Sequence, residues 1–250
     1  MAAVDLFADP LALRDAAAEV VIRHAAESVA SRGRFTLVLS GGSTPQALYQ
    51  QLASRHCRDR IAWSQVHLFW GDERCVPPSD PASNFRMARE ALIDHVPIPP
   101  THVHRMRGED VPGIAAADYE ALLRTALGER DQAGAGFDLV LLGLGTDGHT
   151  ASLFPGSPAA RETTRWVVAD HVDAGHGWRI TLTPPALNAA NAVVFLVAGA
   201  AKADALAAVL EEPPAPHALP AQQIVGRGGS TRWMVDRPAA SRLTGAPSGR

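Results

Sequence analysis

Short apolar runs alternate with segments of helical spacing along most of this chain of 250 residues. The runs are rich in branched and aromatic side chains, as buried strands are, and they cover residues 35–39, 66–70, 137–142, 166–170, 178–183, 192–197 and 231–235. Apolar residues recur at helical spacing in 10–30 and 115–127. This alternation predicts an α/β fold with a doubly wound, mainly parallel sheet that is flanked by helices.

The composition is that of a chain with a substantial core. Hydrophobic residues make up 46% of it and charged residues 20%, so it needs neither disulfides nor a metal to fold. We expect a single domain over residues 1–250, with two smaller domains as the alternative.

Charge and hydropathy disfavour several classes of partner. The formal charge is -3 and the arginines are scattered, which leaves no basic stripe for nucleic acid. Residues 1–10 carry acids where a secretion signal has bases, and no apolar run approaches the roughly 18 residues that a membrane span requires. With Cys57 and Cys75 as the two cysteines, we expect a reduced cytoplasmic protein without a membrane partner, as a monomer or a weak homodimer.

A polar cluster follows the apolar run at 137–142. Three glycines, at 143, 145 and 148, surround Asp147 and precede His149. Sites at the carboxyl end of a parallel strand are built in this way, so we expect a site here. The alternative is an ordinary turn, which explains an Asp-Gly pair better than it explains the whole cluster.

The glycine spacing in this cluster also matches the fingerprint of dinucleotide-binding proteins. That fingerprint needs a helix of several turns directly after the glycines, and Pro155 and Pro158 leave little room for one. Asp147 would also repel the diphosphate. We therefore expect no dinucleotide, and no cofactor of another kind.

A second glycine loop, residues 40–45, follows the run at 35–39. Gly41 and Gly42 let backbone amides approach a ligand, and Pro45 fits the first position of a helix that Thr44 or Ser43 would cap. Such a helix start suits a phosphate, and a plain capped turn is the alternative. No lysine follows the glycines as in a nucleotide-triphosphate loop.

Charged residues follow two further strands. Asp72 and Arg74 come after the run at 66–70 and would face the same crevice, unless they form an exposed ion cluster. Lys202 is expected in the first turn of a helix, where the dipole disfavours a cation. Either a bound anion offsets this, or the side chain carries its charge into water. His102 and His104 lack further ligands nearby, so we expect no metal. Residues 211–220 are predicted to be a loop or lid.

Five motifs together resemble the 6-phosphogluconolactonase family, in order and over nearly the whole chain. They are Ser40-Gly41-Gly42-Ser43-Thr44-Pro45, Gly71-Asp72-Glu73-Arg74, Gly143 to Pro155, Arg179-Ile180-Thr181-Leu182-Thr183, and Gly199-Ala200-Ala201-Lys202. The resemblance implies metal-free hydrolysis of 6-phospho-D-glucono-1,5-lactone in the oxidative pentose phosphate pathway. It also implies the doubly wound α/β fold shared with glucosamine-6-phosphate deaminase.

Glucosamine-6-phosphate deamination is the main alternative function that is compatible with this resemblance. Deaminases typically carry Asp-Glu-Tyr where this chain has Asp72-Glu73-Arg74, and Glu where it has Phe154. Isomerising an amino sugar needs several acids for proton transfer, so these departures favour the lactonase. A non-catalytic sugar-phosphate sensor is a third possibility, which His149 and Asp147 argue against.

For a lactonase, we expect His149 to act as the base that activates water. Asp147 would hold the imidazole tautomer or bind sugar hydroxyls, and Ser152 lacks the sequence context of a nucleophile. The oxyanion donor is left open between Arg74, Arg179 and the amides of Gly145 to Gly148. The phosphate and sugar are assigned to Gly41, Gly42, Ser43, Thr44, Asp72, Arg179 and Lys202.

Overall fold

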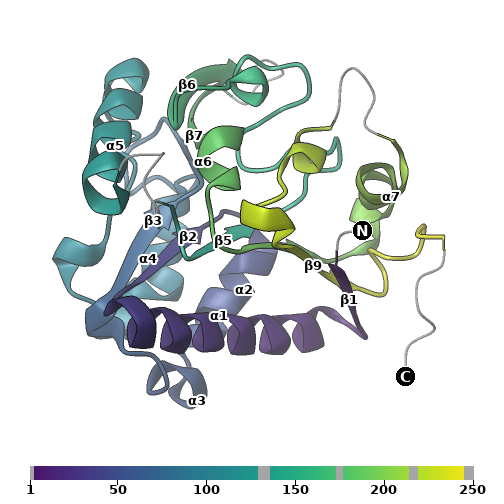
Figure 1. The fold of residues 1–250 in the computed structure, drawn as a ribbon, viewed down its shortest axis with the longest axis horizontal. Helices are drawn as coiled ribbons and strands as arrows, with labels where there is room; N and C mark the ends of the chain where they lie inside the picture. The colour runs from purple at the N-terminus through teal and green to yellow at the C-terminus, as the bar shows by residue number, and fades with distance from the viewer. Residues whose placement is uncertain (1–2, 129–135, 173–176, 214–218, 245–250) are drawn as a thin grey trace.

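The structure is a computed structural model that describes residues 3–128, 136–172, 177–213 and 219–244. Within them the chain forms two sheets (Figure 1). The larger is parallel, with the strands in the order β1 (Ala3–Phe7), β9 (Thr231–Asp236), β8 (Val193–Val197), β5 (Leu139–Leu142), β2 (Phe35–Leu39) and β3 (Val66–Trp70). The smaller is antiparallel, with the order β4 (Asp72–Arg74), β7 (Gly177–Leu182) and β6 (Val167–Val172).

The helices connect these strands. The α-helices are α1 (Pro10–Arg32), α2 (Ser43–Ala53), α3 (Arg55–Arg58), α4 (Asn84–Ala91), α5 (Pro112–Leu127), α6 (Pro184–Asn188) and α7 (Ala203–Glu211). Short 3₁₀ helices are η1 (Trp63–Gln65), η2 (Ile93–His95), η3 (Pro100–His102), η4 (Ala159–Arg161), η5 (Ala200–Lys202), η6 (Pro220–Gln223) and η7 (Arg227–Gly229).

Local sequence explains where α1 begins and ends. Asp9 caps it, because its Oδ1 accepts the backbone N–H groups of Leu11 and Ala12 at 2.9 and 2.8 Å. Gly33 ends it in the left-handed region, with φ at 72°. In Figure 1, α1 lies along the lower side of the large sheet, while the small sheet lies above it.

The order of the large sheet contains a switch point between β2 and β5. From β2 the chain continues to β3 on one side, whereas from β5 it continues to β8 and β9 on the other side. The connections leave these two neighbouring strands in opposite directions, so a crevice opens outside their carboxyl ends. Both glycine loops, at 40–45 and 143–148, leave the sheet at this point.

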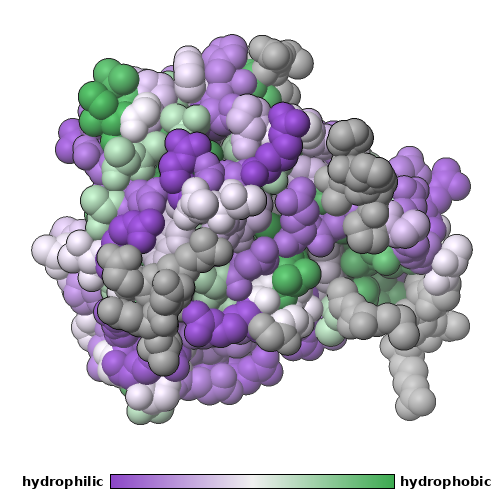
Figure 2. Space-filling model, turned by 45° about the horizontal axis from the view of Figure 1, so that its top comes forward, coloured by the Kyte–Doolittle hydropathy of each residue, from purple (hydrophilic) through white to green (hydrophobic). Residues whose placement is uncertain are grey.

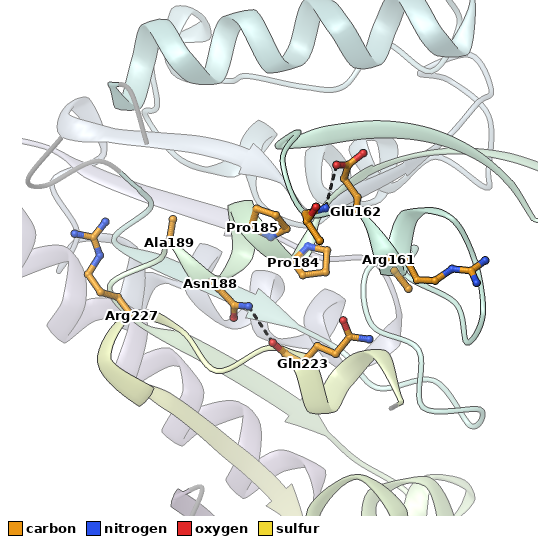
Figure 3. A pocket seen from close by; sticks show the side chains of 10 residues that line it. Arg161, Glu162, Pro184, Pro185, Asn188, Ala189, Gln223 and Arg227 are labelled. Atoms are coloured by element: carbon orange, nitrogen blue, oxygen red, sulfur yellow. Dashed lines mark hydrogen bonds between the residues drawn. The ribbon is translucent and has the colours of Figure 1, made fainter. Parts of the chain in front are cut away.

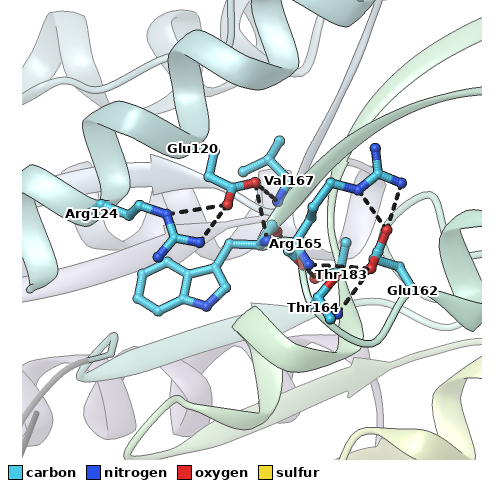
Figure 4. Close-up of polar contacts among 8 residues, drawn as sticks. Glu120, Arg124, Glu162, Thr164, Arg165, Val167 and Thr183 are labelled. Atoms are coloured by element: carbon cyan, nitrogen blue, oxygen red, sulfur yellow. Dashed lines mark hydrogen bonds and ion pairs between the residues drawn. The ribbon is translucent and has the colours of Figure 1, made fainter. Parts of the chain in front are cut away.

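Helix α5 is fixed to the small sheet by a carboxylate (Figure 4). Glu120 Oε2 accepts the backbone N–H groups of Trp166 and Val167 at 3.2 and 3.3 Å, and its Oε1 pairs with Arg124 at 2.7 Å. Beside them, Arg165 pairs with Glu162. The side chain of Glu120 thereby accepts the backbone N–H groups at the start of β6, which would otherwise be unpaired at the edge of the small sheet.

The fold class predicted from the sequence is confirmed, and all seven predicted strands form. The structure differs in one respect from the single, mainly parallel sheet that was predicted. The segments at 166–170 and 178–183 pair with each other and with residues 72–74 in a separate antiparallel sheet. The edge strand β1 was not predicted from the sequence, because residues 3–7 show no clear strand pattern.

The molecular surface is mostly polar on the face shown in Figure 2, where hydrophobic side chains gather in small separate patches. None of the helices in the described ranges is long and apolar enough to cross a membrane.

Candidate active site

A cavity of about 280 Å³ lies at the carboxyl ends of the parallel strands, at the switch point. Its lining residues are Ser40, Gly41, Gly42, Asp72, Arg74, Asn84, Gly143, Leu144, Gly145, His149, Thr150, Ala151, Ser152, Phe154, Arg179 and Lys202. The sequence predicted one crevice for the ends of β2, β3 and β5 and for the segment after β8, and the cavity brings residues from all four together.

The imidazole of His149 is held by Asp147. Asp147 Oδ1 lies 2.5 Å from His149 Nδ1 and also accepts the backbone N–H of His149 at 3.1 Å. Partial burial acts to raise the pKa of Asp147, but its hydrogen bonds with His149 and the charge of that residue lower the pKa overall. An ionised Asp147 accepts the proton on Nδ1, which leaves the lone pair of the ring on Nε2.

Gly145 makes room for this ring. A Cβ at Gly145 would lie 2.1 Å from His149 Nδ1 and 2.6 Å from Asp147 Oδ1. The backbone of Gly145 also donates to the carbonyl oxygen of His149 at 2.8 Å. The loop after β5 therefore folds back on itself, and the described chain forms no helix between Gly143 and Pro158. This geometry agrees with rejecting the dinucleotide fingerprint.

The start of α2 differs from the predicted cap. Gly42 is the N-cap, with φ at 103°, and Ser43 is the first helical residue, which makes Pro45 the third. Neither Ser43 nor Thr44 caps the helix with its side chain, because the glycine already supplies the positive φ at which the helix begins. Neither residue is among those that line the cavity, whereas Gly41 and Gly42 are, so this loop meets the cavity through its two glycines.

Three cations border the cavity. Arg74 and Arg179 lie directly opposite each other in the pairing of β4 with β7. Burial lowers the pKa of Arg179, and the adjacent charge of Arg74 lowers it further. Lys202 lies at the N-cap position of α7. Like charges at opposed positions repel, and a bound anion between them would remove that repulsion.

Asp72 is buried, with 8% of its surface exposed, and two side chains bind it. Ser152 Oγ donates to its Oδ2 at 2.7 Å, and Asn84 Nδ2 donates to its Oδ1 at 3.3 Å and to its carbonyl oxygen at 2.9 Å. Ser152 is thus an anchor for Asp72. Asn84 was missed from the sequence, since it opens a helix 12 positions away without any motif of its own.

Glu73 fixes the segment that carries Asn84. Its carboxylate accepts the backbone N–H groups of Arg74, Asn84 and Phe85, at 2.7 to 2.8 Å, and the hydroxyl of Ser83 at 3.0 Å. Burial raises the pKa of Glu73, although these hydrogen bonds act to lower it. The middle residue of the Asp-Glu-Arg motif is therefore structural.

The structure also describes Cys75 and part of the predicted 211–220 loop. Burial raises the pKa of Cys75 to about 11, so its thiol is protonated at neutral pH although Arg179 lies near. In the 211–220 segment, Glu211 ends α7, while residues 214–218 lie outside the described residues. Within the described ranges, no three His, Cys, Asp or Glu side chains are grouped in a way that could hold a metal ion.

A larger cavity of about 720 Å³ lies between η4, α6 and the segment of η6 and η7 (Figure 3). Its lining residues include Arg161, Asn188 and Arg227. Asn188 donates to the carbonyl oxygen of Gln223 at 2.9 Å, and its Oδ1 accepts the backbone N–H of Val225 at 2.8 Å. Because this lining contains no histidine or cysteine and its Asn188 is committed to backbone contacts, the smaller cavity with His149 is the candidate active site.

Comparison with known proteins gives consistent results. The model of the family described as glucosamine-6-phosphate isomerases/6-phosphogluconolactonase matches residues 8–233. The 6-phosphogluconolactonase of Mycobacterium tuberculosis is 42% identical over 246 residues, which cover 96% of this chain and 98% of that protein. The structure of 6-phosphogluconolactonase from Trypanosoma cruzi superposes with a TM-score of 0.86 at 29% identity, covering 98% of this chain and 97% of the other. The chain also shares its fold with a monomeric glucosamine-6-phosphate deaminase. The two structures superpose with a TM-score of 0.79 at 22% identity, covering 96% of this chain and 99% of the other.

Proposed function

This chain belongs to the glucosamine-6-phosphate isomerase/6-phosphogluconolactonase family, and from that premise we propose that it hydrolyses 6-phospho-D-glucono-1,5-lactone to 6-phospho-D-gluconate. It is a lactone hydrolase of the oxidative pentose phosphate pathway. The observation that carries the mechanism is the His149–Asp147 pair beside three cations in one cavity.

His149 activates the attacking water. With Nδ1 bound to Asp147, Nε2 accepts a proton from water as the water oxygen attacks the lactone carbonyl carbon. Asp147 stabilises the imidazolium that forms, as the orienting acid of a triad does. When the tetrahedral intermediate collapses, the ring oxygen leaves and takes up the proton. Ser152 Oγ is already bonded to Asp72, which favours water over a serine nucleophile.

Arg74 stabilises the oxyanion of the intermediate. The backbone alternative has less support, because the N–H groups of Gly145 and Gly148 donate within their own loop, at 2.8 and 3.1 Å. The phosphate is bound by Arg179, by Lys202 and by backbone amides at the start of α2, among Gly41 to Thr44. Asp72 accepts a hydrogen bond from a sugar hydroxyl. A phosphate bound by Arg179 also offsets the repulsion that Arg74 exerts on Arg179.

His149→Ala tests the assignment of the base. We expect turnover to fall by about 10²–10⁴-fold, the usual contribution of a positioned general base, with binding of the product 6-phosphogluconate kept. Lys202→Ala should instead raise KM with little change in kcat. Unchanged turnover in His149→Ala would remove this residue as the base, and an unchanged KM would remove Lys202 from the phosphate site.

Several features remain predictions. We propose that residues 1–250 form one catalytic domain, and that the enzyme works in the cytoplasm as a monomer or weak homodimer. Size-exclusion chromatography with light scattering tests the oligomeric state.

A further inference from the structure

The ring of His149 is enclosed from two sides in addition to its bond with Asp147. The backbone of Gly145 lies so close to the ring that a Cβ there would be 2.3 Å from Cε1. The ring of Phe154 also packs on it, with ring centroids 4.4 Å apart and planes inclined by 32°. From the sequence, Phe154 was noted only as the residue that stands where deaminases typically carry Glu.

A tight turn brings Phe154 back to His149. The backbone N–H of Leu153 donates to the carbonyl oxygen of Thr150 at 2.9 Å, and the two residues form an isolated antiparallel bridge. Between them, Ala151 has φ at 49°, and it is the only non-glycine residue with a positive φ in the part of the chain that the structure describes. A residue with a Cβ adopts this conformation only at an energetic cost, so the surrounding structure must impose it.

The turn is anchored by hydrogen bonds at both ends. Thr150 Oγ1 donates to the carbonyl oxygen of Gly143 at 2.8 Å. Ser152 binds two elements, since its Oγ donates to Asp72 at 2.7 Å and its backbone N–H donates to Thr181 Oγ1 at 3.2 Å. These contacts to Gly143, to β4 and to β7 therefore keep Ala151 in its strained backbone conformation.

We propose that Phe154 is a positioning residue for His149, and that the strained turn at 150–153 exists to press its ring against the imidazole. This proposal rests on the proposed role of His149 as the base. Phe154 is half-buried and lines the cavity, next to the ring whose Nε2 must face water and substrate.

A phenyl ring suits this task for two reasons. Because the face of an aromatic ring carries no hydrogen-bonding atom, it fixes the plane of the imidazole without competing for Nε2. It also contributes aromatic packing that opposes rotation of the imidazole away from Asp147. A base displaced by about 1 Å loses about 10²-fold in rate, so this restraint affects turnover more than binding.

The test compares Phe154→Ala, which removes the ring, with Phe154→Tyr, which keeps it. We expect Phe154→Ala to lower kcat by about 10- to 10²-fold with KM changed by less than about 3-fold, and Phe154→Tyr to keep kcat within about 3-fold of the parent. Phe137→Leu is the control, because Phe137 is fully buried at the other end of β5. It should lower the melting temperature without changing kcat.

Crystal structures of Phe154→Ala and Phe154→Tyr give a second readout. The imidazole should leave its position against Asp147, or occupy two orientations, in the Ala variant alone. This readout holds even if the parent protein proves inactive on the lactone, a result that would reject the proposed function separately. An unmoved ring in Phe154→Ala would overturn the proposal. So would a raised KM at unchanged kcat, or equal losses of kcat in the Ala and Tyr variants.

Discussion

Ser152 Oγ donates a hydrogen bond of 2.7 Å to Asp72 Oδ2, which joins the loop after β5 to strand β4 across 80 positions of the chain. A buried carboxylate requires such partners, because losing them leaves its charge desolvated and unpaired. The bond also places the turn that carries Phe154 relative to the cations on the small sheet.

Ser152→Ala should therefore destabilise the fold. Removing one partner of a buried hydrogen-bonded carboxylate costs about 1–3 kcal/mol. Urea denaturation of the parent and the variant measures the loss. Ser79→Ala, at an exposed position, is the control and should leave the midpoint unchanged. Equal midpoints for all three proteins would show that the bond contributes nothing.

Gly145→Ala should displace the imidazole of His149. The added Cβ would lie 2.1 Å from Nδ1, which no real contact allows, so the ring or the loop must move. We expect kcat to fall by about 10²-fold or more. The control is Gly113→Ala in α5, where a Cβ meets nothing within 4 Å. A fully active Gly145→Ala enzyme would contradict the described position of the ring.

His67 should make the fold sensitive to acid. Its ring stacks on His102 with centroids 3.9 Å apart, and its Nδ1 lies 3.1 Å from His104 Nε2. Burial lowers its pKa to about 4, and the charges of His102, His104 and Arg34 act in the same direction. Between about pH 6.5 and pH 4 the unfolded chain binds more protons at this site than the folded chain, so stability falls as pH falls through that window.

Melting temperatures of His67→Gln between about pH 7.5 and pH 5 test this linkage. The decline with acid should be shallower than in the parent, although His104, whose pKa burial also lowers, still contributes. His56→Gln changes an exposed histidine and should follow the parent curve. Parallel curves for the parent and His67→Gln would reject the role of His67.

Cys75 should react slowly despite its place beside the candidate active site. Its pKa of about 11 leaves little thiolate at neutral pH, and the thiolate is the reactive form. In Cys57→Ala, Cys75 is the remaining cysteine, so thiol titration with Ellman's reagent reports on it alone. We expect slow reaction in the native protein and fast reaction in denaturant. Fast reaction of the native variant would contradict the described burial.

The sequence was sufficient to predict which residues meet at the candidate site, because parallel strands end at one edge of a sheet. His149, Arg74 and Lys202 each follow a predicted strand, and the structure gathers them in one cavity. Arg179 was assigned only through the family resemblance. Its place depends on antiparallel pairing with Arg74 across about 100 positions, which local patterns do not encode.

Three features could not be predicted from sequence patterns. The cap of α2 was wrongly placed at Ser43 or Thr44, since the positive φ of Gly42 moved the helix start. Asn84 reaches Asp72 only through the fold of the 83–85 segment around Glu73. Phe154 contacts His149 because Ala151 adopts a conformation that its residue type disfavours.

The most direct test of the function is hydrolysis of freshly generated 6-phosphogluconolactone. Product formation is coupled to NADP-dependent 6-phosphogluconate dehydrogenase and corrected for spontaneous hydrolysis, with ammonia release from glucosamine 6-phosphate measured in parallel. We predict strong acceleration of lactone hydrolysis, lost in His149→Ala, and no ammonia. Ammonia release without lactone hydrolysis, or no activity on either substrate, would contradict the account.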